Sequence, residues 1–226
     1  CGRLSKPRGR LTVLPAAASA PWRPEPRDLL APMAEYKVHV TLQVMAMQEA
    51  VEDLGEALDK GDTAQAGRLI AEAGQARDQL LPALQLLPEA REALASVSSG
   101  LARLTASLPV AGSGGADVPR ETLETLARLR ADSGALFARI GDARITPASM
   151  AAGASRSLRG PDAITPASLD GVGRVVSLLR SLAIRLDPEL QASLDRSLAE
   201  AGKGNRSAFP ILAADLERLG RQLETD

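Results

Sequence analysis

His39 is the only histidine in this 226-residue chain, so acid–base chemistry near neutral pH would depend on it. A Ser-His-Asp triad would need this imidazole as its base. A helical metal site would need a second ligand one turn away, but Gln43 occupies that position. His39 lies beside the apolar face of its predicted helix. We therefore interpret it as a partly exposed surface imidazole and predict no catalytic residue.

Three methionines near this histidine would suit a soft metal or a haem, because thioethers ligate both. Met33, Met45 and Met47 point in different directions around one helix, and the chain has no CxxCH motif and no second histidine. Flexible methionine side chains often fill irregular gaps in a core. We predict that role for all three.

Paired carboxylates and a glycine-rich segment are the remaining groups with chemical potential. Glu52 with Asp53, and Glu121 with Glu124, occupy predicted solvent faces, and the Glu-x-x-His element of di-metal bundles is missing. The segment AGSGGAD lacks the lysine of a phosphate-binding loop. The sequence thus predicts no metal site, no cofactor and no enzyme activity.

The composition favours helices that pack through small apolar side chains. Hydrophobic residues make up 45% of the chain but aromatic residues only 2%, and β-sandwich strands are usually richer in aromatics. The single cysteine excludes an intramolecular disulfide. A net charge of -1 without basic residues interleaved with aromatics argues against nucleic acid, and no apolar run is long enough to predict a transmembrane segment.

Apolar residues recur at spacings of three and four in several segments, which predicts amphipathic helices. The first segment begins at Met33 and runs to about Lys60, where Gly61 ends it and Asp62 caps the next. We predict an all-α fold, a helical bundle of six or seven helices with a disordered N-terminal tail. The other predicted apolar segments are Leu69–Leu84, Leu94–Leu108, Leu123–Ile140, Val172–Leu186, Leu190–Leu198 and Leu212–Leu223.

By composition, the chain divides into four regions. Residues 1–32 form a basic tail rich in Pro, Ala and Arg, residues 33–110 the N-terminal helices, residues 111–118 a glycine-rich linker, and residues 119–226 the C-terminal helices of the same bundle. Residues 143–163 resemble a loop. The pentapeptide ITPAS occurs at Ile145 and Ile164, and its Thr-Pro pair is typical of a helix start.

The first residue, Cys1, has two interpretations. As the residue left by signal-peptide cleavage it would carry a lipid anchor, and residues 1–32 would tether a soluble body to the periplasmic face of a membrane. Alternatively the native chain starts at Met33 and the protein is cytoplasmic. The basic head, rich in Arg and Ala, would equally suit part of an organellar transit segment.

The function that follows is binding rather than catalysis. We expect a non-enzymatic adaptor or scaffold that binds a partner protein through an amphipathic helix. The C-terminal stripe would dock either on its own bundle or on another chain; it consists of Leu212, Leu216, Leu219 and Leu223. The alternative is a carrier that encloses an apolar ligand in a dry internal void. An enzyme that uses His39 is the least favoured reading.

Overall fold

The computed structural model describes residues 22–85, 88–108, 118–142, 144–160 and 164–224. Within these ranges it contains eight helices and no strand, which confirms the predicted all-α fold, with one helix more than the largest number expected. The helices are α1 (Pro26–Asp59), α2 (Thr63–Leu84), α3 (Pro88–Ser107), α4 (Arg120–Asp142), α5 (Pro147–Arg159), α6 (Pro166–Leu186), α7 (Pro188–Gly202) and α8 (Ala208–Leu223).

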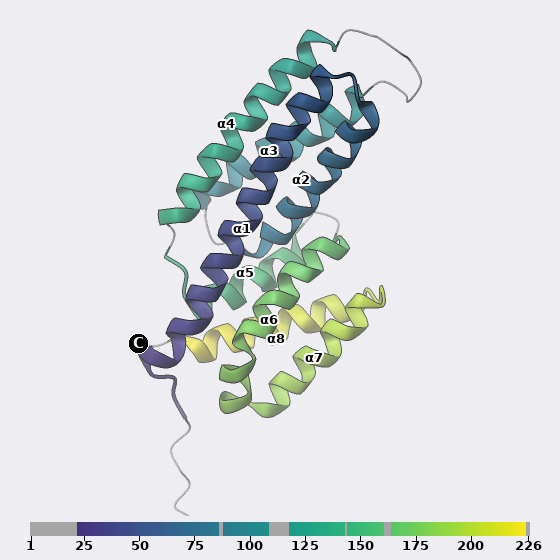
Figure 1. The fold of residues 1–226 in the computed structure, drawn as a ribbon. Coiled ribbons are helices and arrows are strands. Elements are labelled where there is room, and N and C mark those ends of the chain that lie inside the picture. The colour runs from purple at the N-terminus through teal and green to yellow at the C-terminus, as the bar shows by residue number, and fades with distance from the viewer. Residues whose placement is uncertain (1–21, 86–87, 109–117, 143, 161–163, 225–226) are drawn as a thin grey trace, which may run out of the picture.

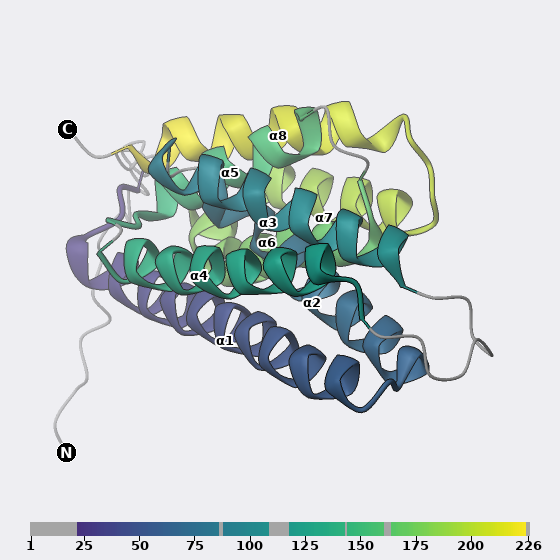
Figure 2. The ribbon, with the colours of Figure 1, turned by 90° about the horizontal axis from the view of Figure 1, so that it is seen from above.

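The long helix α1 connects two groups of helices. Helices α2, α3 and α4 gather around its C-terminal half, and α5 to α8 lie toward its N-terminal half (Figure 1). Helix α2 packs on α1, α3, α5 and α6 and therefore joins the groups. Seen from above, α1 runs along one edge of the molecule (Figure 2).

One cluster of buried apolar side chains contains residues from all eight helices. Leucine, valine and alanine dominate this cluster. Tyr36, Met47 and Met150 are among its largest fully buried side chains. Residues of the predicted apolar segments belong to this cluster. Val97, Leu104 and Leu179, for example, have at most 1% of their surface exposed. Helix periodicity therefore identified most of the core correctly.

The predicted start of the fold at Met33 is wrong. Helix α1 begins at Pro26, because the Glu25 backbone amide donates to the Asp28 carboxylate at 2.9 Å and Pro26 sits in the first turn, where its missing N–H costs nothing. Trp22 also joins the fold, with the Arg185 guanidinium 3.8 Å from its ring centroid. The tail predicted to be disordered was residues 1–32, and its part from Trp22 onward belongs to the fold. Residues 1–21 lie outside the described residues.

The loop predicted at 143–163 is also wrong over most of its length, because Pro147–Arg159 forms α5. Its start is the first ITPAS copy, in which the Ser149 amide donates to Thr146 Oγ1 at 3.1 Å. The second copy does the same at the start of α6, where the Ser168 amide donates to Thr165 Oγ1 at 3.1 Å. The repeat is therefore two helix caps of one kind, as its Thr-Pro pair predicted.

Four residues test smaller predictions. Gly61 adopts a left-handed φ of 68°, and Asp62 accepts from the Gln65 amide at 2.9 Å, so the predicted hairpin between α1 and α2 is confirmed. Leu123 and Phe137, which belong to the predicted apolar segment Leu123–Ile140 and were expected to be buried, are 43% and 42% exposed. Most of the predicted glycine-rich linker lies outside the described residues.

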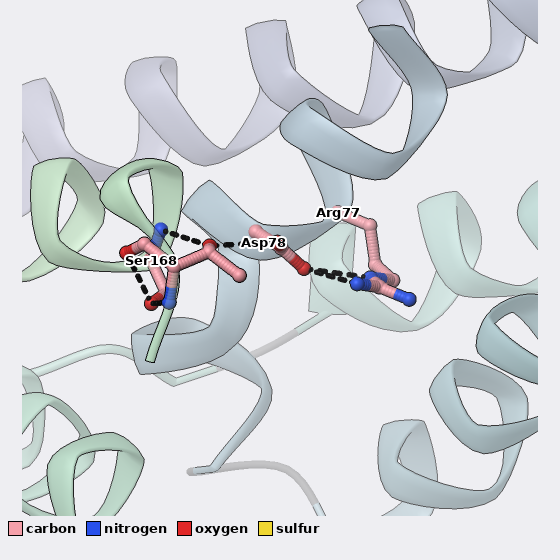
Figure 3. Close-up of polar contacts among 4 residues, drawn as sticks. Arg77, Asp78 and Ser168 are labelled. Carbon is pink, nitrogen blue, oxygen red and sulfur yellow. Dashed lines mark hydrogen bonds and ion pairs between the residues drawn. The ribbon is translucent and has the colours of Figure 1, made fainter. Parts of the chain in front are cut away.

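Helices α2 and α6 meet through a buried polar contact and a close backbone approach. Asp78, which is 7% exposed, lies between the two helices and accepts from Arg77 Nε and from Thr165 Oγ1, each at 2.8 Å (Figure 3). A carboxylate beside the start of α6 also complements the helix dipole. Further along α6, a Cβ at Gly171 would lie 2.5 Å from the carbonyl oxygen of Gln79, the residue after Asp78. The crossing therefore requires glycine at position 171.

We predict that Gly171→Ala destabilises the protein by about 1 to 3 kcal/mol, because the new methyl group must push α6 away from the α2 backbone. Gly173→Ala is the matched control, since a Cβ there meets only Leu198 Cδ2 at 3.6 Å. The free energy of unfolding from urea titration measures both. Equal losses in the two variants would contradict the close approach at Gly171.

Candidate functional site

Helix α1 carries apolar residues on two faces, and only one of them is buried. The inner face includes Tyr36, Val40, Val44 and Met47, each at most 1% exposed. The opposite face exposes Val38, Leu42 and Met45, at 59%, 56% and 51% of their surfaces. A helix that only covers a core normally presents polar residues to water, so the second apolar face is the feature that suggests function.

The exposed face follows a regular spacing of three and four residues, which places its members in one line along the helix. Every member of this line is exposed. We call it the outer seam; it consists of Arg27, Ala31, Ala34, Val38, Leu42, Met45 and Glu49. Its middle is apolar and its ends carry opposite charges. Leu30, which is 60% exposed, widens the apolar area on one side.

Ion pairs attach the sides of α1 to its neighbours and leave the outer seam uncovered. Arg174 of α6 lies 3.8 Å from Glu35, and Arg130 of α4 lies 3.6 Å from Glu52. Such exposed pairs contribute little stability individually. They mark the edges of the area of α1 that α4 and α6 cover. Both helices pack on α1, and Val38 nevertheless remains 59% exposed.

His39 lies at the border of the outer seam, on the side that faces Arg174 of α6. The imidazole is half-buried and stacks on Tyr36 with 6.2 Å between ring centroids. Its Nε2 atom is buried and has no hydrogen-bond partner within the described ranges. Burial lowers the pKa of His39, and the positive charge of Arg174 lowers it further. His39 is therefore neutral at pH 7. The sequence predicted a partly exposed imidazole, but it did not predict that Nε2 would be buried.

The two sets of sites predicted from sequence have different outcomes. The C-terminal stripe, Leu212, Leu216, Leu219 and Leu223, is at most 2% exposed and packs inside the bundle, where α8 meets α5 and α7. This is the first of the two arrangements considered for it, and it leaves no stripe surface for a partner. Cys1, the predicted lipid attachment residue, lies outside the described residues.

The prediction that all three methionines fill the core is wrong for Met45. Met47 is fully buried, Met33 is half-buried and Met45 is exposed. Two residues of helix correspond to a rotation of about 200°, so Met45 and Met47 must face opposite ways. The signal that would have found the outer seam was present in the sequence: Val38, Leu42 and Met45 repeat at a helical spacing on the face opposite Tyr36.

Two clefts between helices, within the described part of the chain, have mixed linings. One of about 370 Å³ between α1 and α2 is lined by Glu49, Asp53, Glu72 and several glutamines. Another of about 400 Å³ lies between the start of α6 and the turn from α7 to α8. Both open to solvent. They do not supply the enclosed apolar cavity that a carrier of an apolar ligand would need.

Two further observations bear on the class of site. Within the described ranges, no three His, Cys, Asp or Glu side chains come together in a way that could hold a metal ion. In the same ranges, none of the helices combines the length and apolar character needed to span a bilayer.

The fold and the exposed seam define an all-α bundle with an apolar helix face available for contact. No protein-family model matches the chain. It is 38% identical over 90 residues to the iron uptake system component EfeO of Yersinia pestis, which is 39% of this chain and 24% of that protein. A second EfeO, from Yersinia pseudotuberculosis serotype I, is 37% identical over 89 residues, with the same shares. The match thus spans about a quarter of the length of these curated relatives.

We predict that His39 makes the protein less stable as the pH falls below about 6.5, the ordinary pKa of histidine. Because its pKa is lowered in the folded state, the unfolded chain binds the proton first, and stability that is complete above this pH is lost toward the folded-state pKa. In His39→Gln, the free energy of unfolding should change less between about pH 5 and pH 7. Parallel pH profiles for the two proteins would contradict the prediction.

Proposed function

We propose that this chain is a non-enzymatic component of an iron uptake system and that it acts through protein–protein contact at the outer seam of α1. The similarity to the iron uptake system component EfeO supports the proposed role in iron uptake. The observation that carries the mode of action is the exposure of Val38, Leu42 and Met45 on a helix whose opposite face is already buried.

An apolar helix face in water favours a protein partner over a small molecule. A convex helix surface buries little of a small ligand, whereas a second helix covers it along its length. Val38, Leu42 and Met45 supply the apolar centre of such a contact, and Arg27 and Glu49 supply a polar rim. This arrangement is typical of helix-in-groove or helix-on-helix recognition.

Binding rather than catalysis is also consistent with the surroundings of the only histidine. His39 Nε2 is covered by the fold, so it cannot reach a substrate without local opening. The proposal therefore assigns His39 a packing role at the junction of α1 and α6, and it requires no chemistry from this side chain.

Iron uptake by cells tests the proposal. In a strain that lacks the protein, the double variant Val38→Glu, Leu42→Glu should leave iron uptake at the level of the deletion, because a carboxylate is costly to bury in an apolar contact. Ile211→Glu is the matched control, since Ile211 is 54% exposed on α8, far from the outer seam in sequence. It should restore uptake fully.

His39→Ala should also restore uptake in this assay, and circular dichroism should show that every variant is folded. The proposal fails if the double variant supports normal iron uptake. It also fails if His39→Ala, while folded, abolishes uptake, since that would indicate chemistry at the imidazole.

A further inference from the structure

We propose that the outer seam of α1 binds the outer seam of a second copy of this chain, antiparallel, with a two-fold axis that passes through Val38. The inference rests on the proposed function, which assigns this face to a protein contact, and it names the partner. Its basis is that the outer seam has the same spacing in both directions from Val38.

The positions of the outer seam are symmetric. Ala34 and Leu42 lie four residues before and after Val38, and Ala31 and Met45 lie seven before and after it. Arg27 and Glu49 complete the pattern at eleven residues on either side. A two-fold axis through Val38 therefore places each member level with its counterpart on the second copy, which is the geometry of an isologous interface.

Side-chain sizes are complementary in this arrangement. Each apolar level beside the axis pairs a large residue with a small one: Leu42 with Ala34 of the second copy, and Met45 with Ala31 of the second copy. Only the axis pairs like with like, and there the residue is the medium-sized Val38. Alternating large and small residues allow two helices to approach closely, as knobs enter holes in a coiled coil.

The charges at the two ends select the antiparallel orientation. Arg27 would lie level with Glu49 of the second copy, and the same pair recurs at the other end. A parallel pairing in register would instead place arginine against arginine and glutamate against glutamate. Arg27 pairs with Glu25 within the chain, but both side chains are more than 60% exposed. Glu49 is exposed as well.

The second copy has access to this face. Helix α1 runs along an edge of the molecule (Figure 2), and its neighbours α2, α4 and α6 pack on its other sides. From Arg27 to Glu49 the outer seam extends over roughly 33 Å at 1.5 Å per residue. A contact of this length holds about six turns of helix from each copy, enough for a two-stranded interface.

Sedimentation velocity of the purified chain tests whether it forms a dimer. The wild type should sediment as a dimer at micromolar concentration. Val38→Glu places two carboxylates against each other at the axis and should raise the dissociation constant at least about a hundredfold. Ile211→Glu should remain a dimer. A wild-type chain that stays monomeric at about 100 µM overturns the inference, since its dissociation constant would then lie far above the micromolar value expected.

Charge exchange tests the ends of the outer seam. Arg27→Glu and Glu49→Arg should each weaken the dimer, because like charges then meet. The double variant should restore it, since both pairs are opposite again. A double variant as weak as the single ones contradicts the pairing of these two positions.

Cysteine cross-linking tests the orientation in a Cys1→Ser background. Val38→Cys should form an intermolecular disulfide under mild oxidation, and so should Met45→Cys combined with Ala31→Cys. Met45→Cys alone should not, because two copies of position 45 would lie roughly 21 Å apart along the helices, beyond the ~7 Å limit for a disulfide. Efficient cross-linking of Met45→Cys alone would indicate a parallel pair and overturn the inference.

These results are distinguishable from the outcome for the proposed function. A monomeric wild type whose iron uptake is nevertheless lost in the Val38→Glu, Leu42→Glu variant refutes the second copy as partner and leaves the proposed function standing. A dimer that Val38→Glu dissociates, without loss of iron uptake in that double variant, supports the inference and refutes the proposed function.

Discussion

The burial of one apolar face along α1 is the constraint on which the rest of the structure depends. Helices α2, α4, α5 and α6 all pack against this helix, and its inner face contributes side chains from Tyr36 to Leu58 to the common core. Since the helix has a single axis, fixing this face inward also fixes what points outward. Val38, Leu42 and Met45 are therefore exposed as a consequence of the packing of Val40, Val44 and Met47.

Small side chains make this packing possible. With few aromatic residues, the chain fills its core by bringing backbones close, and at Gly171 the approach is so tight that a methyl group would meet the Gln79 carbonyl. Polar groups at the same crossing are satisfied, because Asp78 accepts hydrogen bonds from Arg77 and Thr165. Tight backbone contact and a buried, fully bonded carboxylate together fix the position of α6 on α2.

The position of α6 in turn shapes the surroundings of α1. Burial lowers the pKa of His39, and the positive charge of Arg174, which also lies 3.8 Å from Glu35, lowers it further. His39 is half-buried next to an apolar surface that remains open. The curated iron uptake components to which the chain is similar are about four times as long as the matched segment.

Local patterns in the sequence determined the helices, their apolar faces and several caps, because these depend on residues within a few turns of one another. The Gly61 turn and the Thr-Pro starts of α5 and α6 are of this kind. The sequence alone did not place Met45, Phe137 or the C-terminal leucines from Leu212 to Leu223. Periodicity shows which residues share a face, but whether that face is covered depends on helices distant in sequence. Only the tertiary structure showed that α5 and α7 cover the stripe on α8, and that the outer seam of α1 stays open.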